Sequence, residues 1–415
     1  MPSLLHARTA KVLLLVFFSC LCALAQQLPQ QLETFLRERV QFSDKQLADA
    51  AQGKAVAKIL SSDRNEIAVF GTVLIHAPAE LYVERFRDIE PFKKGTAVPI
   101  VKKFGEPPRL DDVRELTVDE EDFNALKDCR VGKCDVKLPS EIIERLQAEI
   151  DWSAPDARQK VDRLARAALL EYVKRYQQGG NAELSEYNDK KTPRRVAEEF
   201  DAILKASPYI YDYTPEFYAY LREYPRKRLD NVEDFIYWSK EKFGLKPVIS
   251  VTHVSIYPEP QRKVTLIASK QIYASHYFEA SLGLTVVVPA GNGFYLLYFN
   301  RSRADALRGG FSGMVRGKVQ GRIDTSADLY VEKDGTVEAE VITQNIDIHG
   351  TVVGNITASD RFEIHPGGAV TGDVRAPRVV LADGGKYKGR IEMEVALEKV
   401  EKPAATVSTK IRRNA

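Results

Sequence analysis

A seven-residue phrase, close to Gly-x-Val-x-Gly-x-Ile, recurs near the C-terminus and constrains the fold more than any other feature of the chain. It reads GTVVGNI at 350–356, GAVTGDV at 368–374 and GKYKGRI at 385–391, at steps of 18 and 17 residues. Looser copies begin at Gly335 and Gly317. Apolar residues at every second position predict strands with one buried face. A nearly constant step predicts that these strands stack as the coils of a β-solenoid.

The repeat also predicts which side chains face inward. We expect Gly354 and its equivalents to form a column where a narrow interior has no room for a side chain. We expect the glycines that open the phrase, such as Gly368, to lie at corners with positive φ. The alternative fold is an antiparallel β-sandwich, but sandwiches do not keep one sequence phase over five units. The predicted solenoid core consists of Val337, Val341, Ile346, Ile348, Val352, Gly354, Ile356, Phe362, Ile364, Val370, Gly372, Val374, Val379, Leu381, Tyr387, Gly389 and Ile391.

The segment 348–394, which contains the run EIHPGGAVTGDVRAP at 363–377, resembles the bactofilin family of polymer-forming cytoskeletal proteins. The resemblance covers about 334–395, or about 317–395 if the loose copy that begins at Gly317 is included. It gives no information about the rest of the chain. It implies a right-handed, three-sided parallel β-helix. It also implies domains that join end to end into filaments without nucleotide and serve as scaffolds at the cell envelope.

The first 25 residues predict a secretory signal. Basic residues precede the apolar run 12–24, which ends in Ala-Leu-Ala before Gln26. This run is short for a membrane span, which needs about 20 residues. We therefore expect export to the periplasm or cell envelope, with cleavage after Ala25. The alternative is an uncleaved membrane anchor formed by residues 12–24.

Removal of the signal would leave two of the four cysteines, Cys129 and Cys134, in the segment DCRVGKCDVKLP. In an oxidising compartment, so close a pair predicts a disulfide that closes a small loop. A redox pair or two metal ligands are the alternatives. The spacing is longer than that of zinc or thioredoxin-like motifs, and no nearby histidine completes a site.

Residues 26–315 predict an α+β domain with a mainly helical middle at 107–245. Ser43 can cap a helix through 47–60, residues 66–76 read as a strand, and Pro78 opens an amphipathic helix. That strand and helix faintly resemble the start of START-like helix-grip domains. Four further strands are expected between 247 and 300, joining 66–76 in one antiparallel sheet. The helices expected in the middle are 139–150, 155–177, 193–206, 215–224 and 231–243.

Three further stretches are the segment that joins the two domains, the C-terminal tail and a tyrosine-rich run. The sequence between the two domains predicts a helix from Arg301 to about Val315, and the solenoid is expected at 317–397. Residues 398–415 predict a disordered tail. The tyrosine-rich run 209–224 favours packing of a helical face over a glycan-stacking platform.

No catalytic, cofactor or metal site is expected. The chain has no phosphate loop and no Gly-x-Ser-x-Gly elbow, and no histidine pair has metal-ligand spacing. His349 and His365 precede glycine corners one coil apart. They predict stacked surface rings rather than a proton-linked assembly switch. A net charge of +2 gives no expectation of nucleic acid binding.

The sequence therefore predicts a non-enzymatic envelope scaffold that self-associates through the ends of its β-helix, with peptidoglycan or envelope proteins as further partners. The alternative is a ligand-binding (START-like) or hydrolytic N-terminal domain that the β-helix multimerises. A deep apolar pocket in the 66–300 region would favour this alternative.

Overall fold

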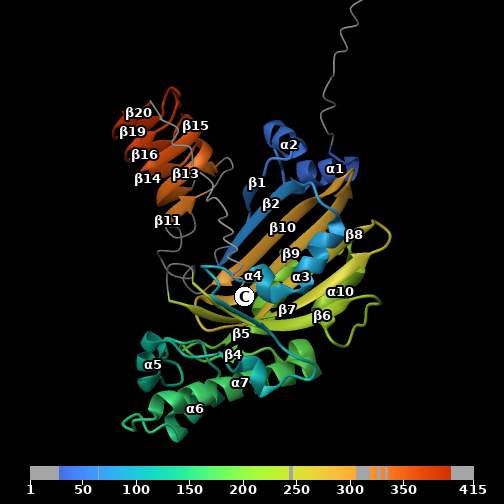
Figure 1. The fold of residues 1–415 in the computed structure, drawn as a ribbon, viewed down its shortest axis with the longest axis vertical. Helices are drawn as coiled ribbons and strands as arrows, with labels where there is room; N and C mark the ends of the chain where they lie inside the picture. Colours follow the sequence, from blue (N-terminus) through green and yellow to red (C-terminus); the bar gives the residue numbers. More distant parts are fainter. Residues whose placement is uncertain are drawn as a thin grey trace, which may run out of the picture.

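The computed structural model describes residues 28–63, 65–242, 246–304, 318–324, 329–331 and 335–393. An N-terminal α+β domain is followed by a separate parallel β-solenoid (Figure 1). This fold class is the one that the sequence predicts, and it is confirmed. The predicted signal and tail, and most of the predicted seam helix, lie outside the described residues.

An eight-stranded antiparallel sheet forms the centre of the N-terminal domain, in the order β1-β2-β10-β9-β8-β7-β6-β3. The four strands expected between 247 and 300 are all present and join the predicted strand at 66–76. The strands are β1 (Val56–Leu60), β2 (Glu66–Ile75), β3 (Ile100–Lys103), β6 (Glu233–Glu241), β7 (Val248–Glu259), β8 (Val264–Ala274), β9 (Phe278–Ala290) and β10 (Gly293–Ala304).

Helices cover both faces of this sheet. On one face, α3 and α4 pack through Val83, Phe86 and Ile89 against strand residues such as Phe235 and Val254. The opposite face carries the larger core, to which α1, α2, α7, α8, α9 and α10 contribute. The helices are α1 (Gln30–Glu38), α2 (Asp44–Ala51), α3 (Ala79–Arg87), α4 (Ile89–Lys93), α5 (Glu120–Lys127), α6 (Ser140–Glu149), α7 (Ala157–Gly179), α8 (Val196–Lys205), α9 (Pro208–Tyr213) and α10 (Pro215–Glu223), with short 3-10 turns η1 (Leu110–Val113) and η2 (Gly180–Glu183).

The predicted helix at 231–243 is wrong, because Glu233–Glu241 is the strand β6 between β3 and β7. Phe235 and Tyr237 pack against α3 and α4, whereas Ile236 and Trp238 enter the core on the opposite face. A strand that is buried on both faces reads as a continuous apolar run, which period alone cannot distinguish from a helix.

Two other boundaries also differ from the prediction. The helix expected through 47–60 ends at Ala51, and Val56–Leu60 pairs with β2 as the edge strand β1. Arg301 and Arg303 do not begin a helix, because Arg301–Ala304 extend β10 along β2 and β9. Both arginines are buried there against carboxylates: Arg301 pairs with Glu66, and Arg303 Nε lies 2.5 Å from Glu199.

The tyrosine-rich segment packs as expected. Phe217 and Tyr220 of α10 are buried in the larger core, and Phe217 stacks on Tyr257 of β7. Tyr211 remains exposed. Among the helices that the structure describes, none combines the length and the apolar character needed to cross a membrane.

The solenoid is built from parallel strands that repeat along the chain. They are β11 (Lys318–Asp324), β12 (Leu329–Val331), β13 (Thr336–Ile348), β14 (Thr351–Val353), β15 (Ile356–Ile364), β16 (Ala369–Thr371), β17 (Val374–Arg375), β18 (Arg378–Leu381), β19 (Lys386–Lys388) and β20 (Ile391–Glu392). A two-stranded sheet of β4 (Glu186–Tyr187) and β5 (Arg194–Arg195) lies beside α7 in the N-terminal domain (Figure 1), and α8 follows β5 directly in the chain.

Candidate functional site

The candidate site is the solenoid, whose coils are held in register by backbone hydrogen bonds. Val337 pairs with Val352, Val352 with Val370, and Val370 with Tyr387, so these residues form one column. A parallel column runs from Val341 through Ile356 and Val374 to Ile391. The stacking bonds are short: Gly354 N–H donates to Thr371 O at 2.8 Å, and Val374 N–H to Arg390 O at 2.8 Å.

The interior of the middle coils is apolar. The buried predicted residues are Val337, Val341, Ile346, Ile348, Val352, Ile356, Phe362, Ile364, Val370 and Val374. Val379 and Tyr387 are partly buried against them. Burial of about ten such side chains is the main source of stability in a domain of this size.

Leu381 and Ile391 were predicted as core residues, but both are exposed, at 55% and 37%. Each occupies an inward column, since Leu381 pairs with Ile364 and Ile391 with Val374. They are exposed because they lie in the last described strands, on which no further described strand stacks. The repeat gives the direction of a side chain, whereas its burial depends on a neighbouring coil.

The roles predicted for the two glycine sets are partly wrong. Positive φ belongs to the inner column, with values of 144° at Gly354, 147° at Gly372 and 157° at Gly389. At the other corner, Gly367 and Gly384 take positive φ, one residue before the glycines that were predicted to do so. A Cβ atom at Gly372 would overlap the carbonyl oxygen of Gly354 in the preceding coil. The positive φ and the close approach of the preceding coil therefore require glycine here, rather than a narrow interior.

Outward polar side chains also connect the coils at this corner. The side-chain oxygen of Asn355 accepts the Asp373 N–H at 3.0 Å, and Asp373 Oδ1 accepts the Arg390 N–H at 3.0 Å. Arg375 pairs with Glu392 across one coil step, at 2.7 Å. These contacts reinforce the register that the apolar columns set.

A charged cluster lies on the side of the solenoid around Asp347, whose side chain is buried. His365 Nε2 lies 3.3 Å and Arg361 Nη2 3.0 Å from its carboxylate. Lys45 of α2, in the N-terminal domain, reaches the same carboxylate at 3.2 Å. The rings of His349 and His365 stack at 4.0 Å, which confirms the predicted stacking.

Asp347, Glu363 and His365 present ligand atoms close enough together to hold a metal ion. However, the guanidinium of Arg361 contacts both carboxylates. Because this side chain already supplies the positive charge, we interpret the cluster as a structural ion-pair network that also ties the solenoid to α2.

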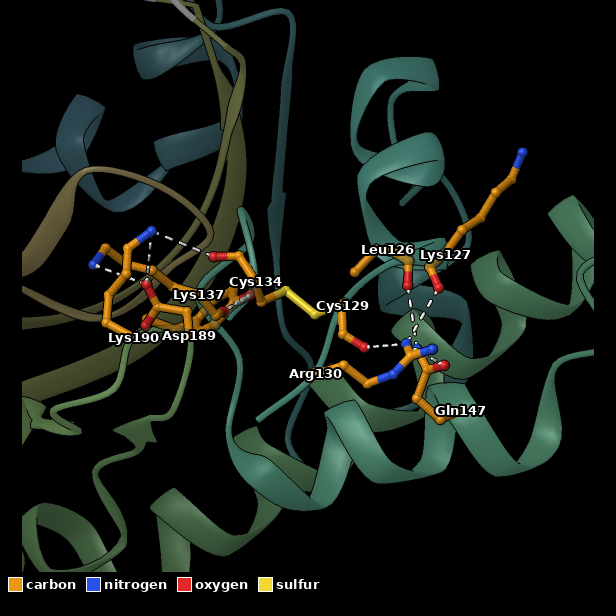
Figure 2. The surroundings of a disulfide bond; sticks show 10 residues. Leu126, Lys127, Cys129, Arg130, Cys134, Lys137, Gln147, Asp189 and Lys190 are labelled. Atoms are coloured by element: carbon orange, nitrogen blue, oxygen red, sulfur yellow. Dashed lines mark hydrogen bonds and ion pairs between the residues drawn. A yellow bond between two sulfur atoms is a disulfide. The ribbon is translucent and has the colours of Figure 1, made fainter. Parts of the chain in front are cut away.

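The two cysteines form a disulfide, with Cα atoms 4.5 Å apart (Figure 2). Cys129 follows α5, and the neighbouring Arg130 donates to Gln147 of α6 at 2.6 Å. On the other side, Cys134 N–H donates to Asp189 O at 2.9 Å. The loop therefore joins the α5–α6 layer to the segment beside β4, and both sulfur-bearing residues are buried.

Sequence reasoning missed a buried polar network inside the N-terminal domain. Tyr176 of α7 bonds His253 Nδ1 at 2.9 Å, and His253 Nε2 bonds Asp234 at 2.9 Å. Lys270 of β8 lies within 3.3 Å of the Tyr176 hydroxyl, and also contacts Asn181. The chain positions are far apart, so no local motif could have revealed this arrangement.

Lys270 is the exceptional member of the network, because it is almost fully buried and its hydrogen-bond partners among the described residues are Tyr176 and Asn181 rather than a carboxylate. Burial lowers the pKa of Lys270 well below its usual range. The groups around it are phenol, amide and aromatic rings, including Phe200 at 4.1 Å from Nζ. Burial therefore disfavours the charged form of this amine in the folded protein.

Comparison with known proteins agrees with the geometry of the solenoid. Residues 307–392 match the family model described as "Bactofilin: Polymer-forming cytoskeletal". The C-terminal domain belongs to the bactofilin family. The N-terminal domain lies outside the match, and no solved structure matches the chain.

Two curated relatives come from Myxococcus xanthus (strain DK1622). Bactofilin BacO is 45% identical over 82 residues, which is 20% of this chain and 65% of the relative. Bactofilin BacP is 40% identical over 102 residues, which is 24% of this chain and 42% of the relative. The chain therefore spans less than two thirds of either relative, and the similarity covers its C-terminal region.

Substitution of the glycine column should disrupt the solenoid. Gly372→Leu introduces a Cβ that overlaps the Gly354 backbone, in a φ region that leucine rarely adopts, so we expect a loss of at least about 2 kcal/mol of domain stability. Thr371→Leu, one residue away on the exposed face, should melt like the wild type. Thermal melts of both variants decide this, and equal effects would show that the assignment of inward and outward faces is wrong.

Lys270 should make stability depend on pH. The unfolded chain binds a proton at this lysine up to about pH 10.5, and the folded chain releases it at lower pH. Stability should therefore rise with pH as the pH approaches about 10.5 from below, by at most about 1.4 kcal/mol per pH unit from this group.

Lys270→Met should flatten this dependence, because it removes the proton that unfolding takes up. Lys174→Met, an exposed change on α7, should leave it unchanged. Urea unfolding at several pH values measures how the free energy of unfolding changes with pH in the wild type and in the two variants. The same slope in wild type and Lys270→Met would mean that the folded protein keeps Lys270 protonated.

Proposed function

We propose that this protein is a non-enzymatic, self-assembling scaffold of the bacterial cell envelope that polymerises through the ends of its β-helix. The observation that carries the proposal is the apolar end of the solenoid. In the last described coil, Val380, Leu381, Ile391 and Met393 are all exposed, although Leu381 and Ile391 belong to inward columns.

The backbone at this end is also available for pairing. Strands β18, β19 and β20 each pair on one side only among the described strands. Unpaired strand edges accept further strands readily, and a second solenoid coil would supply both the hydrogen bonds and the apolar cover. The name of the matched family supports polymer formation in the same region.

The envelope part of the proposal depends on export to the periplasm, for which two observations speak. The sequence 12–25 has the pattern of a cleaved signal. The buried disulfide of Cys129 and Cys134 is the type of bond that persists in oxidising compartments. Peptidoglycan and envelope proteins are the partners that we propose for the N-terminal domain.

End-to-end assembly should depend on the exposed inward residues. The double variant Leu381→Lys/Ile391→Lys of the full chain should lose filaments in electron microscopy, because stacking would bury two charges. Its melting temperature should change little, since both side chains are exposed in the single chain.

Val353→Lys is the matched control. Val353 is also an exposed apolar residue, at 42%, but it lies on the side of a middle coil. Filaments should persist in this variant. Assembly that is equally sensitive to Val353→Lys would instead place the contact on the side of the solenoid.

The export proposal predicts the chemistry of the protein recovered from its own compartment. Mass spectrometry should find Gln26 as the N-terminal residue, and a non-reducing peptide map should recover Cys129 linked to Cys134. Two free thiols together with an intact Met1 would contradict export, because free thiols indicate a reducing compartment and an intact Met1 shows that the signal was not cleaved.

A further inference from the structure

One end of the large sheet in the N-terminal domain presents uncharged polar side chains. Side chains on a strand alternate between its two faces, so every second residue after Phe294 and Leu296 of β10 shares the face on which α3 and α4 pack. The strand register identifies the neighbouring positions on β9 and β8. We call this set the polar face, and it consists of Ser269 and Gln271 on β8, Ser281 on β9, and Tyr298, Asn300 and Ser302 on β10.

The polar face is unlike a sheet surface that merely meets water. None of its residues is charged, although 28% of the residues in the chain are. Its side chains are half-buried, apart from Tyr298, which is 44% exposed. Two charged groups that lie near Tyr298, Lys93 and Glu241, pair with each other at 2.9 Å. A surface without net charge favours a neutral partner over a phosphate or an acidic peptide.

The protein itself uses only part of the hydrogen-bonding capacity of the polar face. Ser281 and Ser302 bond each other at 2.8 Å, and Ser302 donates to Asn300 Oδ1 at 2.7 Å. The Asn300 amide nitrogen, however, is 3.4 Å from each of its two acceptors, which is long for a hydrogen bond. Gln271 donates to Ser250 at 3.0 Å, but its side-chain oxygen is buried and has no hydrogen-bond partner among the described residues. A ligand that supplied these long or missing bonds would be bound favourably, because an unpaired amide group costs free energy.

Tyr298 gives the polar face an aromatic surface. A Cβ atom at Gly283 of β9 would lie 3.3 Å from the hydroxyl oxygen of this tyrosine. Glycine at 283 therefore lets the ring lie against the sheet, where part of it stays open to solvent. A tyrosine ring combines a flat apolar surface with a polar hydroxyl, which suits a sugar ring with an apolar face and a polar rim.

We propose that the polar face binds a glycan of N-acetylhexosamine units, the sugar type of peptidoglycan strands, with one sugar ring on Tyr298. Sugar hydroxyl groups donate and accept hydrogen bonds, as do serine, asparagine and glutamine side chains. The acetamido N–H is the donor that the Gln271 oxygen lacks, and the acetamido carbonyl can accept from Asn300. This inference rests on the proposed envelope location, where such a glycan is available, and is independent of filament formation.

Isothermal titration calorimetry of the full chain with chitotetraose, a soluble oligomer of N-acetylglucosamine, tests the proposal. Cellotetraose, which has hydroxyl but no acetamido groups, should bind about tenfold more weakly or worse. Tyr298→Ala should weaken chitotetraose binding about tenfold or more, because it removes the ring. Tyr298→Phe keeps the ring and should bind within about threefold of the wild type.

Tyr211→Ala is the matched control. Tyr211 of α9 is also an exposed tyrosine, at 59%, but α9 packs on the opposite face of the sheet, so chitotetraose binding should not change. Thermal melts establish that Tyr298→Ala folds. If it does not, Asn300→Lys replaces it, since a long charged side chain on the polar face should also abolish binding.

Four results would overturn the proposal. They are no binding of chitotetraose, equal affinity for cellotetraose, wild-type affinity in a folded Tyr298→Ala variant, and an equal loss in Tyr211→Ala, which would place the sugar on α9. Electron microscopy of the same protein separates this inference from the scaffold proposal. Filaments without chitotetraose binding would refute the glycan site alone, and chitotetraose binding without filaments would refute assembly alone.

Discussion

Backbone hydrogen bonding between successive coils is the interaction on which the bactofilin domain depends. These bonds form only if neighbouring coils approach to about 4.8 Å along their whole length. At Gly354 and Gly372 the chain turns with positive φ directly against the coil before it. A side chain at either position would separate the coils locally and expose the apolar columns on both sides. The glycine column and the Val352–Val370 column therefore both depend on the close stacking of neighbouring coils.

The same requirement explains why the domain is suited to assembly. A solenoid satisfies its backbone only where a coil has neighbours on both sides, so each end is incomplete by construction. Leu381 and Ile391 show this directly, since they keep the register of buried columns but remain exposed. End-to-end stacking would complete both the hydrogen bonds and the core with no new type of contact.

The N-terminal domain is held together in a different way. Helices cover both faces of its sheet. The disulfide loop connects the α5–α6 layer to the segment next to β4. Two features depart from simple close packing: the buried amine of Lys270, and the cavity beneath α6 and α7. The first disfavours maximal stability, since a buried lysine costs free energy.

The sequence by itself determined the solenoid, because its information is local and periodic. A step of 17 or 18 residues brings Val352, Val370 and Tyr387 into one column without any knowledge of distant parts of the chain. It also indicated the central strands β7–β10 and the proximity of the two cysteines. Only the tertiary structure decided that Glu233–Glu241 is a strand, because an apolar run takes its form from the neighbours on both faces. The same is true of the exposure of Leu381, the Lys270 network and the cavity: each depends on which distant segments meet, and period and propensity carry no information about that.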